Sequence, residues 1–244
     1  MTQLNRKPFH WMRLRSSLFQ CFLASALVGV TAAVADALPN GTWFSKPQIM
    51  FHLSNGTLGP VMERVRAQRY RVVFLDFRNV SNLDQQKVAQ TARDYQLIPV
   101  AWIQSPQFRA LSVQQLVDEG KYTDGIQVDD HYFAHYSRRD FYALRSQYTK
   151  PIYCSIQPFQ AEQVSTAGCN QVDVQCYSAV TLRQCVGLAD RLKAVTSLSA
   201  QNTLGYGEVI GGRSFNVFLW PHSDEFAGRA PVQKVEATSW NNGL

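Results

Sequence analysis

Two adjacent carboxylic acids, Asp129 and Asp130, follow a short, mostly apolar run and are the residues best suited to chemistry in this sequence. Gln127 and Asp129 are two positions apart, so in a β-strand their side chains share one face. We expect that face to point into the protein's functional centre. An acid at the end of such a strand is costly unless it is paired or functional. The alternative is that the two acids form a loop turn or cap a helix.

A further carboxylate, Glu208, lies in the segment GYGE at 205–208. Paired carboxyl groups can act on a glycosidic bond, because one can protonate the leaving oxygen while the other acts as a base or a nucleophile. We therefore predict Asp129 and Glu208 as a catalytic pair, with Asp130 orienting the substrate or holding Asp129 in its ionised form. The alternative for Glu208 is an exposed or ion-paired acid. Asp76 is the second choice as the partner acid, although it can also pair with Arg78.

Amide, histidine and aromatic side chains lie at the ends of the other predicted strands. Amides and histidines can bind sugar hydroxyls, and flat aromatic rings can stack on sugar faces. The predicted substrate-binding residues are His52, Asp76, Trp102, Gln157, Gln175, Tyr177 and Trp220. A single aromatic residue is more typical of a protein core, so this prediction depends on their joint placement.

Two histidines follow the aspartates and give the pattern D-D-H-x-x-x-H, from Asp129 to His135. These are plausible metal ligands. However, no further histidine or cysteine lies at helical spacing from them, so we predict no metal and no other cofactor. The serine hydrolase motif G-x-S-x-G is absent as well.

The elements that must position these residues are short apolar runs that alternate with amphipathic stretches. Strands are predicted at 49–53, 71–76, 97–103, 125–130, 151–157, 172–177, 203–210 and 215–220. Helices are predicted between them at 60–70, 83–95, 112–120, 137–148, 159–167 and 181–196. This order favours parallel strands joined by right-handed crossovers. The carboxyl ends of such strands form one rim, where we expect Asp76, Asp129 and Glu208 to meet.

Eight strands favour an α/β fold of the TIM type, a closed (β/α)8 barrel, in a single domain at 36–244. That length is near the lower limit for this fold, roughly 200 residues. The link from Ile210 to Phe215 is too short for a crossover helix. Either the seventh helix is missing, or one of the last strands is misplaced. An open doubly wound sheet is the alternative, but it requires a Gly-rich turn after the first strand, and that turn is absent.

The segment DGIQVDDHYF, from Asp124 to Phe133, resembles strand four of glycosyl-hydrolase-like (β/α)8 barrel families. Members of one such family carry a segment close to D-G-I-H-F-D-D-Y-F-Y, and polygalactosaminidase-type barrels carry a shorter D-G-x-x-x-D version. The resemblance implies a secreted barrel that acts on polysaccharides, with Asp129 at the position of the family's strand-end acid. Acids on strands four and seven also resemble the arrangement in a large group of retaining glycosidases. The chain departs from these families in its short length and missing helix, so an inactive glycan-binding barrel with an envelope role is the alternative.

Residues 1–35 have the three parts of a secretory signal: a basic start, an uncharged apolar run and small residues in the A-x-A pattern. An uncleaved membrane anchor is the alternative, because the run is nearly long enough to span a bilayer. This leader carries four basic and no acidic residues, so the net charge of +6 falls to +2 without it. We therefore predict a secreted or periplasmic protein that contacts the membrane only through its leader. The expected partner is a polysaccharide or oligosaccharide and not a nucleic acid, because no basic patch with interleaved aromatic residues is present. No oligomeric state is predicted.

Four cysteines follow the leader, and an exported protein can form disulfides. Sequence alone leaves three complete pairings open. The predicted elements place Cys154 and Cys176 on the outer faces of neighbouring strands and Cys185 on the inner face of the next helix. We expect these three to cluster with at most one bridge among them, and Cys169 to lie apart.

Overall fold

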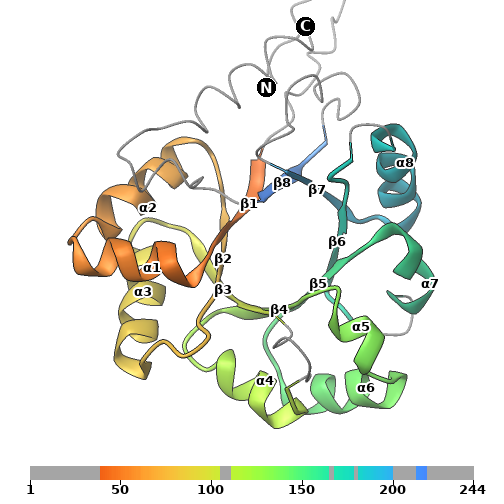
Figure 1. Cartoon of the computed structure of the whole chain (residues 1–244), viewed down its shortest axis with the longest axis horizontal. Helices are drawn as coiled ribbons and strands as arrows, with labels where there is room; N and C mark the ends of the chain where they lie inside the picture. Colours follow the sequence, from red (N-terminus) through yellow and green to blue (C-terminus); the bar gives the residue numbers. More distant parts are fainter. Residues whose placement is uncertain (1–38, 105–110, 165–167, 179–180, 200–212, 219–244) are drawn as a thin grey trace, which may run out of the picture. The chain divides into compact units, whose positions relative to one another are not determined.

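The computed structural model of the protein describes residues 39–104, 111–164, 168–178, 181–199 and 213–218. In this part of the chain eight parallel strands form a closed barrel, each paired with the next in sequence and the last with the first (Figure 1). The strands are β1 (Pro39–Phe44), β2 (Val72–Leu75), β3 (Ile98–Ile103), β4 (Gly125–Val128), β5 (Ile152–Ile156), β6 (Gln171–Gln175), β7 (Val195–Ser199) and β8 (Phe215–Phe218). The predicted TIM-type (β/α)8 fold is confirmed.

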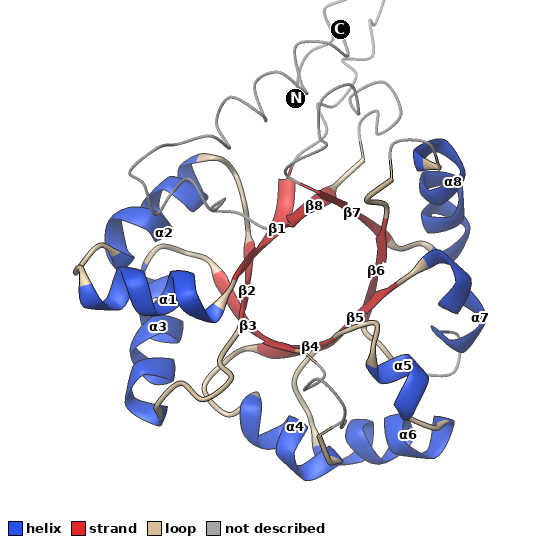
Figure 2. Ribbon diagram, in the orientation of Figure 1, coloured by secondary structure: helices blue, strands red, loops and turns tan. Residues whose placement is uncertain are grey.

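The helices lie around the outside of the ring of strands (Figure 2). They are α1 (Lys46–Ser54), α2 (Leu58–Ala67), α3 (Asn82–Asp94), α4 (Val113–Glu119), α5 (Tyr132–His135), α6 (Arg138–Gln147), the 3-10 turn η1 (Pro158–Gln160), α7 (Ala161–Val164) and α8 (Leu182–Leu192). Serine caps define three of the starts, because a serine side chain can accept a bond from a free amide of the first turn. Ser81, Ser112 and Ser137 accept hydrogen bonds from the backbone amides three residues later. Among the described residues, no helix is both long enough and apolar enough to span a bilayer.

Strand residues alternate between the helices and the barrel interior. Ile126 and Val128 belong to the large apolar core that the helices cover. Gln127, the residue between them, is also buried, but its side chain faces the barrel interior. The predicted facing of β4 is therefore confirmed. The same period of two holds on the other strands and divides each into an outer row, which is mostly apolar, and an inner row.

The interior of the barrel has an aromatic side and a polar side. Apolar inner residues from β1 to β3 form a separate buried cluster, against which Tyr153 and Phe218 pack: Trp43, Val72, Phe74, Val100 and Trp102. The inner rows of β4 to β8 instead carry buried polar residues: Gln127, Ser155, Asp173, Ser197 and Asn216. TIM-barrel interiors are usually filled by branched apolar residues, so the polar side requires an explanation.

The predicted first strand at 49–53 is wrong, because these residues lie in α1. The first strand is Pro39–Phe44. The backbone amide of Ser45 donates to Gln48 Oε1 at 2.8 Å, and Pro47 occupies the first turn. Both features favour a helix start. Periodicity cannot separate a short apolar run in a strand from one in a buried helix, and this is the source of the error.

The end of the barrel also differs from the prediction. The predicted helix at 181–196 ends at Leu192, where Lys193 adopts a left-handed conformation with φ 53°, and residues 195–199 form β7. The link from Ile210 to Phe215 therefore does not join two barrel strands, because β8 follows β7. The predicted strand at 203–210, any helix between β7 and β8, and the leader at 1–35 lie outside the described residues.

Two disulfides link residues of β5 and α8 to residues of the segments next to β6. Cys176 is bonded to Cys185, which agrees with one bridge among the three clustered cysteines. Cys169 does not lie apart as predicted, because it is bonded to Cys154. The reason is the register of β5 and β6: Cys154 is aligned with Val172, so the residues just before β6 run beside β5.

Candidate functional site

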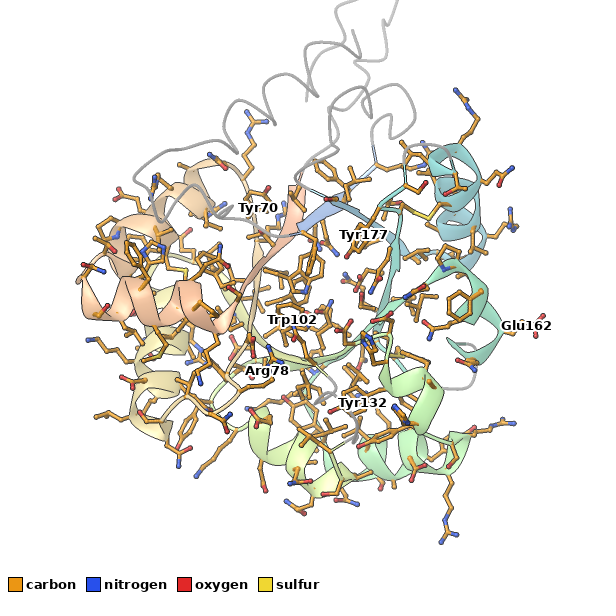
Figure 3. The ribbon with its side chains drawn as sticks, in the orientation of Figure 1. Tyr70, Arg78, Trp102, Tyr132, Glu162 and Tyr177 are labelled. Atoms are coloured by element: carbon orange, nitrogen blue, oxygen red, sulfur yellow. A yellow bond between two sulfur atoms is a disulfide. The ribbon has the colours of Figure 1, made fainter. Side chains whose placement is uncertain are left out.

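A cavity of about 240 Å³ opens at the carboxyl ends of the strands, where TIM barrels carry their sites. We call it the mouth cavity. Its lining residues are Trp43, Trp102, Asp129, Asp130, His131, Ser155, Gln157, Gln175, Tyr177 and Phe218. Figure 3 shows two of them, Trp102 and Tyr177, within the ring of strands. Six predicted site residues therefore line the same cavity: Trp102, Asp129, Asp130, Gln157, Gln175 and Tyr177.

Asp129 is a buried acid at the floor of this cavity, with 8% of its surface exposed. Its Oδ1 accepts the backbone N–H of Asp130 at 2.9 Å. Burial raises the pKa of Asp129 well above its ordinary value, and the negative charges of Asp130 and Asp173 raise it further. The carboxyl group is thus held toward its protonated form and can donate a proton to a bound molecule.

Asp130 is held by the segment that follows β5. Gln157 Nε2 donates to its Oδ2 at 2.5 Å, and Gln160 Nε2 donates to its backbone oxygen at 2.9 Å. His131 Nδ1 lies 3.1 Å from its Oδ1, with 67% of the histidine side chain exposed. These contacts fix the Asp130 carboxylate next to Asp129.

The same acids and His131 offer ligand atoms within 4.8 Å of one another, a geometry in which a cation could bind. His135, the other histidine of the sequence pattern, is exposed on α5 and is not a member of this group. Such a grouping of ligand atoms does not by itself establish a metal site, so the prediction of no metal stays a prediction.

Aromatic rings form the wall that faces the acids. The Phe218 ring is central: its centroid lies 5.5 Å from that of Trp43, 5.7 Å from Trp102 and 5.4 Å from Tyr177. Trp43 also stacks on Phe74 at 4.5 Å. Ring pairs at these separations are mutually favourable, so the wall is a rigid apolar surface.

Asp173 lies in the barrel interior next to the residues of the cavity and is fully buried. Its carboxylate accepts hydrogen bonds from Gln127, Ser155 and Ser197. Burial raises the pKa of Asp173 to about 6, and these three hydrogen bonds act in the opposite direction. Burial, with the charge of Asp173 as the next cause, also raises the pKa of Tyr177 well above its ordinary value.

Two predicted substrate-binding residues do not line the mouth cavity. His52 is buried in α1, and its Nδ1 lies 2.8 Å from Thr57 Oγ1. Burial and the charge of Arg64 lower the pKa of His52 to about 4, which is typical of a neutral core histidine. Asp76 directly follows β2, which ends at Leu75, and it is paired with Arg78 at 2.8 and 2.6 Å, the alternative that the sequence left open.

Glu208 and Trp220 lie outside the described residues, so their predicted roles stay predictions. Glu208 falls in the segment between β7 and β8 and not within β7, because β7 ends at Ser199.

Several cavity residues, and the adjacent Asp173, were not predicted. Trp43 was missed because the first strand was placed in α1. Ser155 could have been found by counting two residues back from Gln157, and Asp173 by counting two back from Gln175, since alternate residues share a face. Phe218 lies two residues before Trp220, on the same side of the predicted last strand.

No protein-family model matches the chain. No curated protein matches it either. Solved structures do match. Orotidine 5'-monophosphate decarboxylase from Methanocaldococcus jannaschii, complexed with an inhibitor, gives a TM-score of 0.58 at 8% identity, over 83% of this chain and 97% of that chain. A truncated 3-deoxy-D-arabino-heptulosonate 7-phosphate synthase from Thermotoga maritima gives 0.55 at 11% identity, over 86% and 89%.

Deoxyribose phosphate aldolase from Aeropyrum pernix also gives a TM-score of 0.55 at 11% identity, over 84% of this chain and 91% of that chain. The chain is similar to TIM barrels. At such low identities the likeness shows the fold alone, because this fold carries many unrelated activities. Any function must therefore be argued from the mouth cavity itself.

Proposed function

We propose that the protein is an exported glycoside hydrolase that cleaves an extracellular or cell-envelope polysaccharide, with Asp129 as the proton donor. The observation that carries this proposal is a buried carboxyl group of raised pKa that faces a wall of aromatic rings. The acid of a glycoside hydrolase needs a raised pKa to stay protonated until it protonates the leaving oxygen. The aromatic wall offers flat apolar surface for a sugar ring, and the amides of Gln157 and Gln175 offer partners for its hydroxyls.

The second carboxylate of this proposal is Glu208. In a retaining enzyme it lies about 5–5.5 Å from the acid and acts as nucleophile, whereas a separation of roughly 6.5–9.5 Å leaves room for a water and gives inversion. The prediction that Asp130 holds Asp129 in its ionised form is wrong, because the charge of Asp130 raises the pKa of Asp129. In this proposal Asp130 instead helps to retain the proton on Asp129, and its backbone amide donates to the Asp129 carboxyl group. The leader would deliver the protein to its polymeric substrate outside the cytoplasm.

Replacement of Asp129 by asparagine tests the proposal. The wild-type protein is assayed for release of reducing ends from a panel of extracellular polysaccharides, and binding is measured with soluble cellohexaose, maltohexaose and chitohexaose. We expect Asp129→Asn to lose on the order of 10²–10⁴ in turnover, which is typical for loss of a general acid, while binding is retained. Asp118→Asn, an exposed acid on α4, is the matched control and should keep full activity.

Two outcomes would contradict the proposal in different ways. Full activity of Asp129→Asn would remove Asp129 from the mechanism. A wild-type protein that binds a glycan and never cleaves it would favour the inactive glycan-binding barrel.

A further inference from the structure

Asp173 is an acid inside the barrel without a cationic partner among the described residues. It has 1% of its surface exposed. Gln127 Nε2 donates to Oδ1 at 2.9 Å, and the hydroxyls of Ser155 and Ser197 each donate to Oδ2 at 2.8 Å. Burying an acid with only neutral donors around it costs free energy that an apolar residue would not cost. The position therefore calls for a role that a leucine or valine could not fill.

The first chain of hydrogen bonds runs from Asp173 to the aromatic wall. A glutamine amide has donors at one end and an acceptor at the other. Because Gln127 must donate to Asp173, its Oε1 is turned toward Trp43, whose indole Nε1–H donates to it at 2.6 Å. The carboxylate thus determines which way the Gln127 amide points, and the amide holds the Trp43 ring that lines the mouth cavity.

The second chain of hydrogen bonds runs from Asp173 to the polar wall. Ser155 has one hydroxyl proton and gives it to Asp173, so it can only accept from its other neighbour. That neighbour is Gln175, whose Nε2 donates to Ser155 Oγ at 3.1 Å. With its nitrogen turned to Ser155, the Gln175 amide offers its carbonyl oxygen as an acceptor, and its second N–H as a donor, to a bound molecule.

We propose that Asp173 is a positioning residue of the mouth cavity: through Gln127 it fixes the Trp43 ring, and through Ser155 it fixes Gln175 so that its carbonyl oxygen accepts from a ligand hydroxyl. The sugar as ligand rests on the proposed function, whereas the two chains of hydrogen bonds rest on the geometry alone. Both chains start at one carboxylate and end in the cavity, one at β1 and one at β6, which lie well apart around the ring (Figure 2).

The donor-to-acceptor direction of the hydrogen bonds in both chains depends on the charge of Asp173. Burial raises the pKa of Asp173 to about 6, so the hydrogen-bond directions described above are those of the ionised carboxylate, above that pH. Protonation would turn one carboxyl oxygen into a donor, and one of the three incoming donors would then lose its acceptor. The titratable groups that act electrostatically with Asp173 from the neighbouring elements are Asp129 and Asp130 after β4 and Tyr177 after β6. The described parts of β7 and β8 place Ser197 and Asn216 next to Asp173, and neither side chain titrates in this pH range.

The first arm of the test needs no ligand. The indole N–H resonance of Trp43, assigned with Trp43→Phe, is followed by nuclear magnetic resonance from pH 4 to pH 8 in the full-length protein. We expect it to titrate with a midpoint near 6 in the wild type, to titrate likewise in Asp129→Asn, and to lose this titration in Asp173→Asn. An indole resonance that does not respond to pH, or that titrates unchanged in Asp173→Asn, would overturn the proposal.

The second arm separates positioning from general stability with two matched serines. Ser155 and Ser197 donate to the same Asp173 oxygen at the same distance, but only Ser155 lies in the cavity lining and contacts Gln175. We expect Ser155→Ala to weaken binding of chitohexaose, cellohexaose or maltohexaose, measured by quenching of tryptophan fluorescence, by about tenfold. Ser197→Ala should change binding by less than about twofold.

The outcomes of the second arm are also distinct. Equal losses in the two serine variants would show a merely structural role and would contradict the proposal. If the wild type binds none of the three hexaoses, the proposed function loses its support. The Trp43 titration then still decides the role of Asp173.

Discussion

The protonation of Asp173 should govern part of the pH dependence of stability, and Asp173→Asn isolates this part. The pKa of the carboxyl group rises from 3.8 in the unfolded chain to about 6 in the folded protein. A shift of one unit corresponds to 1.36 kcal/mol, so the difference is about 3 kcal/mol. Since the folded state binds this proton more tightly, the stabilisation is fully present below pH 3.8 and is lost as the pH rises through about 6. Asp173→Asn has no such proton.

The assay is urea unfolding of wild type and Asp173→Asn at intervals from pH 4 to pH 7, followed by circular dichroism. We expect the free energy of unfolding of the wild type, relative to the variant, to fall by about 3 kcal/mol across this interval. Lost hydrogen bonds in the variant add an offset that does not depend on pH. Loss of the charge of Asp173 also makes the rise in the pKa of Asp129 smaller, which adds to the slope in the same direction, so the slope is the diagnostic quantity. A difference that stays constant with pH would refute the reasoning. Asp118→Asn, which removes an exposed acid, serves as the control.

Three further expectations concern the scaffold and the leader. Replacing Cys154 and Cys169 by alanine opens a loop of 15 residues and should lower the free energy of unfolding by about 3 kcal/mol, measured by urea denaturation. Gly120→Ala would place a methyl group 2.5 Å from Tyr148 Oη, so we expect a loss of about 1–3 kcal/mol in the same assay. N-terminal sequencing of protein recovered outside the cytoplasm should begin at Asp36 or two residues later, whereas an intact first methionine in a membrane fraction would establish an anchor.

Much of the fold could be predicted because local features mark most of its elements. The helices α3, α4 and α6 begin at serine caps, and the strands β2 to β6 are short runs that alternate with helices. These features lie within a few residues of each other, so the sequence contains them directly. The first strand could not be predicted in this way, because PNGTWF is not an apolar run and its pairing with β2 and β8 involves residues far away in the chain.

In the candidate site, too, features set by one strand could be predicted, whereas features set by contacts between strands could not. The inward placement of Asp129 follows from the period of two along one strand, and that prediction needed no knowledge of neighbouring strands. The role of Asp173 depends on donors from β4, β5 and β7 that meet only when the barrel closes. The pairing of Cys154 with Cys169 likewise depends on the register between two strands. Contacts that form across strands have no signature in the spacing of residues along one strand.

The polar side of the barrel interior links stability to the chemistry proposed for the mouth cavity. Asp173 lies close enough to Asp129 for its charge to raise the pKa of that acid, together with burial and Asp130. Two buried acids near each other cannot both ionise without a large electrostatic cost. An apolar residue at position 173 would relieve that cost and stabilise the fold, but it would also release Gln127 and Ser155 and weaken the hold of Asp129 on its proton. The buried Asp173 therefore lowers the stability of the fold, but it helps to keep Asp129 protonated and orients the side chains that line the mouth cavity.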